Sequence, residues 1–200
     1  MKRIVLSTRN RDKIREIQRI MAELPVELVS ISNFANTSEV DEDGDTLEAN
    51  ALKKARYACQ VTGLPALADD TGLEVDALDG APGVYSSRYA GEDVTYEDNN
   101  NKLMKDMQDI PAEKRSARFR CVVAYVDGNE EKVLDGTCEG EILTACSGDK
   151  GFGYDPLFFI PQKGKTFAEM DDLEKNEISH RGEAFMRMTE YLKKKFRMYD

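Results

Sequence analysis

The sequence has a single histidine, His180, among its 200 residues. A zinc site rich in histidine is therefore excluded, and any catalytic triad would have to use this one side chain. Acidic residues are plentiful by contrast, with 38 Asp and Glu against 28 Lys and Arg and a formal net charge of −10. We therefore expect carboxylate chemistry.

Cysteines are few, and apolar runs are short. The four cysteines form no C-x-x-C pair, so we expect reduced thiols and no disulfide framework. No apolar run reaches the roughly 18 residues of a membrane-spanning helix, and no signal-peptide pattern follows Met1. These absences predict a cytoplasmic protein.

The negative charge also limits the partners. It would repel nucleic acids and anionic bilayers at long range, so we expect neither to bind. The length fits one compact domain over residues 1–200, built as two lobes.

Hydrophobic patterning predicts alternating strands and helices. A short strand at residues 4–6 leads into a helix whose apolar spacing ends at Pro25. Further strands are predicted at 26–31, 66–78, 117–127, 132–134, 138–145 and 157–160, and further helices at 46–61, 95–109 and 182–196. The turn at 127–129 predicts a hairpin, and hence an α/β fold with a mixed sheet.

One polar cluster follows a predicted strand, and another lies within one. Residues 7–13 combine hydroxyls, an amide and three cations at a helix start, which favours an anion, although this stretch is not a Walker loop. Asp69 and Asp70 are adjacent in an apolar strand, so their side chains point to opposite faces and need cations or donors nearby. The alternatives are a solvated helix start and a solvated turn.

An acidic run occupies residues 39–48. Its D-x-D-G-D order differs from a calcium loop, and the twelfth position is Leu52 rather than a glutamate, so an EF-hand is rejected. We interpret most of the run as a solvated loop, with Glu48 as the exception because it opens a helix that also carries Lys54.

A fourth cluster is split between residues 151–156 and 175–181. Glycines on either side of Phe152 would let a flat ligand approach its ring, and neighbouring polar groups could bond a heterocycle. The alternative is an aromatic core turn with a helix cap at Ser179.

Together, five ordered motifs resemble the inosine triphosphate pyrophosphatase family across nearly the whole chain. They are S-T-R-N-x-x-K-x-x-E from residue 7, T-L-E-x-N-A-x-x-K-A from 46, A-D-D-T-G-L-x-V-D-A-L-x-G-A-P-G-V-Y-S-S-R-Y-A-G from 68, G-F-G-Y-D-P-x-F from 151 and I-S-H-R from 178. The resemblance implies an elongated mixed β-sheet with flanking helices, in two lobes around a central cleft, and a homodimer.

The resemblance also implies a reaction and its residues. Noncanonical purine nucleoside triphosphates (ITP, dITP and XTP) would be cut to the monophosphate and pyrophosphate with Mg²⁺. Asp70 would be the catalytic base and a metal ligand, with Asp69 beside it. The residues implied to bind substrate are Thr8, Arg9, Asn10, Arg11, Asp12, Lys13, Lys54, Thr71, Phe152, Gly153, Tyr154, Asp155, Lys175, His180 and Arg181.

One position departs from the family pattern. Many members carry a metal-binding glutamate where this chain has Ala49, and the adjacent carboxylate is Glu48. A one-residue shift on a helix turns a side chain by about 100°, but we expect Glu48 to bind the metal with Asp70. A nucleotide-binding regulator without hydrolysis therefore stays an alternative.

Two other enzyme classes share part of the pattern. A Maf-like pyrimidine or modified-nucleotide pyrophosphatase would use similar phosphate and metal chemistry, but the first and last motifs fit the purine family. A haloacid-dehalogenase phosphatase is weaker, because the Asp69-Asp70-Thr71 sequence lacks D-x-D spacing.

Overall fold

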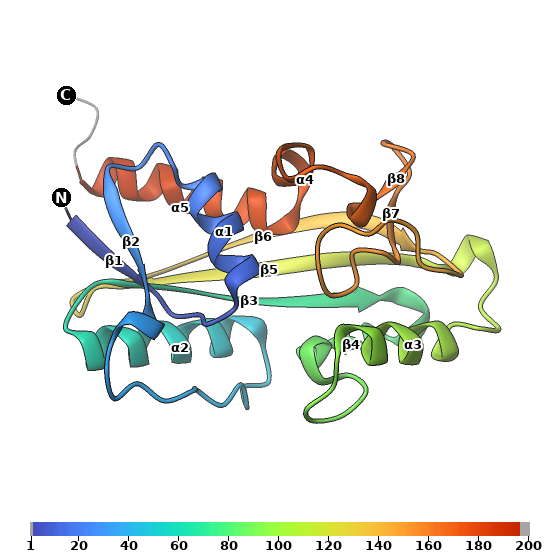
Figure 1. Cartoon of the computed structure of the whole chain (residues 1–200), viewed down its shortest axis with the longest axis horizontal. Coiled ribbons are helices and arrows are strands. Elements are labelled where there is room, and N and C mark those ends of the chain that lie inside the picture. The colour runs from blue at the N-terminus through green and yellow to red at the C-terminus, as the bar shows by residue number, and fades with distance from the viewer. Residues whose placement is uncertain (1, 197–200) are drawn as a thin grey trace. The chain divides into compact units, whose positions relative to one another are not determined.

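The computed structural model describes residues 2–196, in which strands and helices alternate (Figure 1). The strands are β1 (Lys2–Leu6), β2 (Val26–Ser30), β3 (Ala66–Val75), β4 (Pro82–Gly83), β5 (Ser116–Val126), β6 (Glu131–Ile142), β7 (Phe158–Ile160) and β8 (Lys165–Thr166). The helices are α1 (Arg11–Ile20), α2 (Leu47–Thr62), α3 (Tyr96–Asp106), α4 (Asp172–Ile178) and α5 (His180–Lys195). None of these helices combines the length and apolar character needed to cross a membrane.

The strands pair in the order β2-β1-β3-β5-β6-β7-β8, with β4 on β3. β1 is parallel to β2 and β3, whereas β7 is antiparallel to β6 and β8. The predicted α/β fold with a mixed sheet is confirmed. All four cysteines are free thiols, as predicted.

Some element boundaries differ from the prediction. The two strands expected at 132–134 and 138–145 are one strand, β6, because Gly136 does not break it. A Cβ at Gly136 would lie 2.3 Å from the carbonyl oxygen of His180, so this glycine gives α5 room to approach. Helix α4 is too short to show an apolar period and was not predicted.

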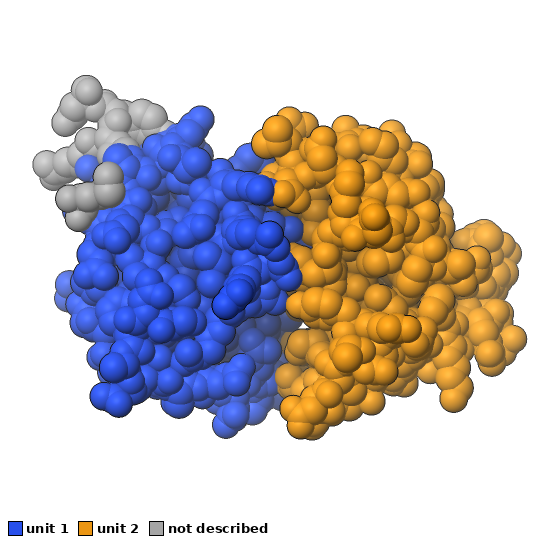
Figure 2. Space-filling model, viewed as in Figure 1, with its two compact units in different colours: residues 1–70, 121–136, 180–200 blue, residues 71–120, 137–179 orange. Residues whose placement is uncertain are grey.

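The chain divides into two compact units, coloured separately in Figure 2. Unit 1 comprises residues 1–70, 121–136 and 180–200, and unit 2 comprises residues 71–120 and 137–179. Strands β3, β5 and β6 contribute residues to both.

Unit 1 is a sheet with helices on both faces. Ile4 and Leu6 of β1 pack with Ile17 of α1 and Phe185 of α5, whereas the alternate residue Val5 packs in a cluster with α2. This alternation places α1 and α5 on one face and α2 on the other (Figure 1). Between these layers, the interior strand β3 carries the two aspartates described below.

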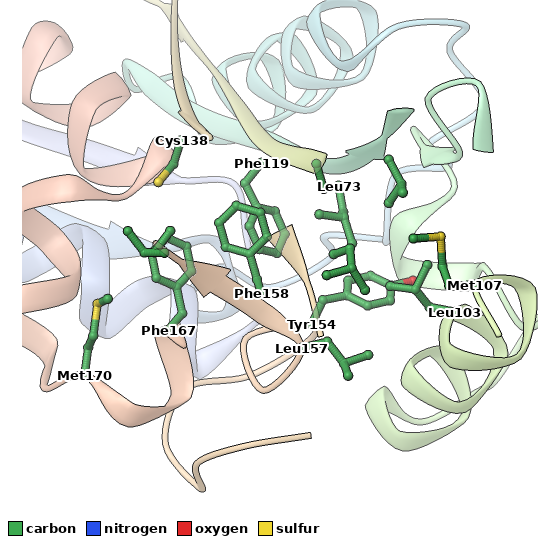
Figure 3. Close-up of a cluster of buried hydrophobic side chains, with 14 residues drawn as sticks. Leu73, Leu103, Met107, Phe119, Cys138, Tyr154, Leu157, Phe158, Phe167 and Met170 are labelled. Carbon is green, nitrogen blue, oxygen red and sulfur yellow. The ribbon is translucent and has the colours of Figure 1, made fainter. Parts of the chain in front are cut away.

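Unit 2 has an aromatic core. The rings of Phe119 and Phe158 meet edge to face with centroids 4.7 Å apart, and the Phe167 ring lies 5.1 Å from that of Phe158 (Figure 3). Leu103 and Met107 of α3 belong to the same cluster. This core supports the loop that contains Phe152.

Candidate active site

The adjacent aspartates of β3 are buried in unit 1, where Asp69 is 2% and Asp70 is 5% exposed. Asp69 Oδ2 lies 3.1 Å from Lys13 Nζ and 3.4 Å from Arg181 Nη2. Asp70 Oδ2 accepts a hydrogen bond of 3.0 Å from Asn50 Nδ2. These partners exclude the alternative of a solvated turn.

The two aspartates have opposite pKa shifts. Burial alone would raise the pKa of Asp69, but the charges of Lys13, Arg181 and Lys54 outweigh it and hold this pKa far below its usual range. At Asp70, burial together with the charge of Glu42 outweighs Lys54, so the pKa is raised. Asp69 therefore stays ionised, while Asp70 has the greater proton affinity that a general base needs.

Lys54 connects Asp70 to a second carboxylate. Its side chain is buried, and Nζ lies 3.4 Å from Asp70 Oδ1 and also pairs with Glu42. Burial lowers the pKa of Lys54, but the charges of Asp70 and Glu42 raise it above the usual value, so the ammonium stays charged. Glu48 lies solvent-exposed in the first turn of α2.

Sequence analysis missed Glu42. The acidic run signalled a loop rich in carboxylates, but a loop has no periodicity from which to tell which side chain turns inward. In the structure, Glu42 is the carboxylate of this run that pairs with Lys54, whose ammonium also contacts Asp70.

The start of α1 is capped by its own sequence. Asn10 Oδ1 accepts the backbone N–H groups of Asp12 and Lys13 at 2.9 and 3.2 Å. Arg9 donates to the carbonyl and hydroxyl oxygens of Thr37 at 2.7 and 3.0 Å. Lys13 thus reaches Asp69, whereas Arg9 binds the segment before α2.

Three other predicted substrate residues are near Asn10 or Asp70 in the sequence. Thr8 accepts the backbone N–H of Asn10 at 3.2 Å, and the exposed Arg11 begins α1. Thr71 follows Asp70 on β3.

Arg181 lies in unit 1 beside Asp69, 2% exposed, with Nη1 2.6 Å from Glu16 Oε2. Burial lowers its pKa, but Glu16 and Asp69 raise it further, so the guanidinium is always charged. His180 is also buried in unit 1, whereas Lys175 belongs to unit 2. The predicted grouping of these three residues is therefore divided between the units.

In unit 2, Asp155 organises the loop around Phe152. Its Oδ2 accepts the backbone N–H of Phe152 at 2.8 Å and lies 2.7 Å from Lys175 Nζ. Lys175 Nζ is also 5.0 Å from the centroid of the Phe152 ring. A Cβ at Gly151 would lie 2.1 Å from Asp155 Oδ2, so a side chain at this position would clash with the carboxylate.

The same loop borders a cavity of about 410 Å³. Tyr96, Asn100 and Phe152 are among its lining residues, and Asn100 Nδ2 donates to the carbonyl of Gly153 at 3.0 Å. Tyr154 is buried and donates its hydroxyl to the carbonyl of Ser86 at 2.9 Å. Phe152 and Gly153 thus face open space, whereas Tyr154 is structural.

The family model of the Ham1 family matches residues 4–191. The chain belongs to the Ham1 family. A dITP/XTP pyrophosphatase of Geobacter sulfurreducens is 50% identical over 96% of this chain and 97% of its own. One of Desulforamulus reducens is 48% identical over 95% of each chain. The family resemblance predicted from the five motifs is confirmed.

A solved structure agrees with this assignment. A HAM1 protein from Coxiella burnetii, 40% identical, matches 97% of this chain and 100% of its own with a TM-score of 0.89. The Ham1 fold is therefore shared along nearly the whole chain.

The described part of the chain offers few grouped ligands for a cation. Among residues 2–196, no three His, Cys, Asp or Glu side chains gather into a metal-binding group. Asp70 and Glu42 are two carboxylates that share one ammonium. Two carboxylates fit Mg²⁺, which keeps several waters and takes further oxygens from a bound phosphate.

Proposed function

We propose that this protein hydrolyses noncanonical purine nucleoside triphosphates (ITP, dITP and XTP) to the monophosphate and pyrophosphate. Asp70, a buried carboxylate with a raised pKa beside Lys54, is the observation that carries the hydrolytic step. The names of the two relatives, which align over nearly their whole length, support the substrate class.

Unit 1 would bind the triphosphate. A triphosphate carries about four negative charges, so a protein of net charge −10 can bind it only where local cations reverse the field. Lys13 and Lys54 supply ammonium groups that are already held in place by Asp69 and Asp70. Thr8 and Asn10 stand at the start of α1 beside Lys13.

Asp70 and Glu42 would hold the magnesium ion, with Glu42 taking the role that the sequence suggested for Glu48. When bound, Mg²⁺ neutralises charge on phosphate oxygens and lowers the pKa of a bound water. Asp70 then accepts the proton of the attacking water, whose oxygen bonds to the α-phosphorus. The bond from the α-phosphorus to its bridging oxygen breaks, and pyrophosphate leaves with that electron pair.

Unit 2 would bind the base. The Phe152 ring provides a flat face, and Lys175 has three N–H donors, of which one goes to Asp155. An ammonium group such as that of Lys175 is a donor that suits the 6-oxo group of hypoxanthine or xanthine. Adenine presents an amino donor at that position, so donor would face donor and ATP would be rejected. His180 and Arg181 stay predicted contributors to base recognition.

We propose a homodimer that works in the cytoplasm and binds neither nucleic acid nor a membrane. The resemblance to the pyrophosphatase family and the net charge of −10 support these statements. Light scattering during gel filtration tests the dimer.

A nucleotide panel tests the substrate class. Pyrophosphate release from ITP, dITP and XTP should exceed that from ATP by about 100-fold or more in kcat/KM, because a donor facing a donor costs several kcal/mol. Preference for pyrimidine nucleotides would favour the Maf-like alternative. Tight binding of ITP without turnover would favour a regulator.

A further inference from the structure

The segment that carries Glu42 lies between Asn33 and α2 and has no helix or strand of its own. We name residues 34–46 the carboxylate loop. Side chains of α2 hold it: Lys53 Nζ lies 2.6 Å from Asp43, and the Tyr57 hydroxyl accepts the backbone N–H of Ser38 at 2.7 Å. Both of these contacts are exposed to solvent.

A third contact is made by a buried side chain of α2 and differs in kind. Asn50 is 0% exposed on α2, and its carboxamide bonds in two directions. Oδ1 accepts the backbone N–H of Gly44 at 2.8 Å, and Nδ2 donates to Asp70 Oδ2 at 3.0 Å. The orientation is fixed, since a flipped amide would set oxygen against the carboxylate and N–H against N–H.

Gly44 shows how closely the carboxylate loop approaches Asn50. A Cβ on Gly44 would lie 2.7 Å from Asn50 Oδ1 and 3.0 Å from the Cβ of Ala49. Any larger residue would push the loop away from α2. The glycine is therefore required for space at this contact.

From these contacts we infer that Asn50 is a positioning residue that couples the carboxylate loop to Asp70. Glu42 lies two residues before Gly44 in the chain. By holding Gly44 against α2, Asn50 keeps Glu42 at the Lys54 ammonium, which also contacts Asp70. By donating to Asp70, it fixes the rotamer of this proposed general base. The inference rests on the proposed function for the importance of the two carboxylates, but its structural part does not.

Hydrogen exchange on the metal-free protein tests the structural part. In Asn50→Ala, the Gly44 amide should exchange at least about fivefold faster, because it loses its acceptor. Asn50→Asp keeps an acceptor for Gly44 but loses the donor to Asp70, so its Gly44 amide should exchange within about twofold of wild type. Asn33→Ala, at an exposed asparagine of the same unit, is the matched control.

Binding of Mn²⁺ to the protein alone, followed by electron paramagnetic resonance, tests the coupling. We expect Asn50→Ala, Asn50→Asp and Gly44→Ala each to weaken Mn²⁺ binding about tenfold or more, as loss of an outer-shell partner does. Asn33→Ala should leave it unchanged. With ITP, the loss should fall on kcat more than on KM.

Unchanged Gly44 exchange and unchanged Mn²⁺ affinity in Asn50→Ala would overturn the inference. Should Asn50→Ala not fold, Gly44→Ala tests the same contact from the loop side, and wild-type Mn²⁺ affinity there would also overturn it. If the variants show these exchange and metal effects but wild type does not turn over ITP, the proposed function fails and the positioning role stands.

Discussion

At the scale of single residues, neighbours with the same side chain differ because their partners differ. Asp69 and Asp70 point to opposite faces of β3, so one meets Lys13 and Arg181 and the other meets Asn50 and Lys54. The first set favours the ionised carboxylate, and the second leaves Asp70 with a raised pKa. A structural anion and a candidate base thus sit on consecutive residues.

Asp70→Asn should abolish most turnover without unfolding the protein. We expect kcat with ITP to fall about 10²–10⁴-fold, as for loss of a general base. Without metal, the midpoint of thermal unfolding should not fall, because Lys54 keeps Glu42 as its partner and a neutral amide avoids burying a charge whose pKa is raised. The exposed Asp79→Asn is the control, and near-normal activity of Asp70→Asn would refute the role of Asp70.

A different residue, Arg115 in unit 2, should matter for stability alone. It is 5% exposed and donates to the carbonyl oxygens of Ile142, Met107, Ile110 and Leu143. Arg115→Met removes the side-chain donor from all four carbonyls, of which Met107 keeps a second donor in the backbone N–H of Ile110.

We expect Arg115→Met to lower the free energy of unfolding by about 3–5 kcal/mol in urea denaturation, since each buried acceptor left unpaired costs about 1–3 kcal/mol. Arg118→Met, which removes partly exposed ion pairs, should cost about 1 kcal/mol or less. Equal losses in the two variants would contradict this account of Arg115.

At the scale of elements, the helices and strands that follow from local sequence patterns were predicted from those patterns. The apolar spacing before Pro25 predicted α1, and the β-branched run near residue 120 predicted β5. The contact of Arg181 with Asp69 spans 112 residues, and no periodicity encodes such a pairing. The motif resemblance identified both residues, but the structure was needed to place Arg181 in unit 1 with Asp69.

The carboxylate loop shows the same limit. Its composition predicted a polar loop, with Glu48 as the metal ligand because it opens the helix that carries Lys54 and is adjacent to Ala49. The side chain that meets Lys54 is instead Glu42, which is held by contacts from α2 that the sequence does not reveal.

The two glutamates should therefore differ when each is neutralised. Glu42→Gln should raise the Mg²⁺ concentration for half-maximal activity about tenfold or more, because it removes a charged ligand. Glu48→Gln should change it less than about twofold, because Glu48 is exposed on α2. Magnesium titration of ITP turnover measures both, and the reverse order would restore Glu48 as the ligand.

At the scale of the whole molecule, the net negative charge does not reveal the few cations that are paired inside unit 1. The charge of −10 is a sum over the whole chain, within which the buried Lys54 and Arg181 and the partly buried Lys13 are paired with carboxylates in unit 1. Removing one partner of a buried pair leaves an uncompensated charge, which costs about 3–5 kcal/mol. These pairs therefore link global stability to pH.

Asp69→Asn should show that link. The folded pKa of Asp69 is lowered, so its stabilisation is present above its unfolded value of about 3.9 and is lost as pH falls through the folded value. The variant should be about 3–5 kcal/mol less stable at pH 7, and the gap should narrow below about pH 4. Urea unfolding from pH 3 to 7 in EDTA measures it, and a gap independent of pH would contradict the pairing.

The bond that is cut is the central claim, and phosphorus NMR of ITP turnover with Mg²⁺ tests it most directly. Attack of water on the α-phosphorus, with Asp70 as the base, predicts equal amounts of inosine monophosphate and pyrophosphate and no inosine diphosphate. Release of orthophosphate with inosine diphosphate as the first product would contradict the account.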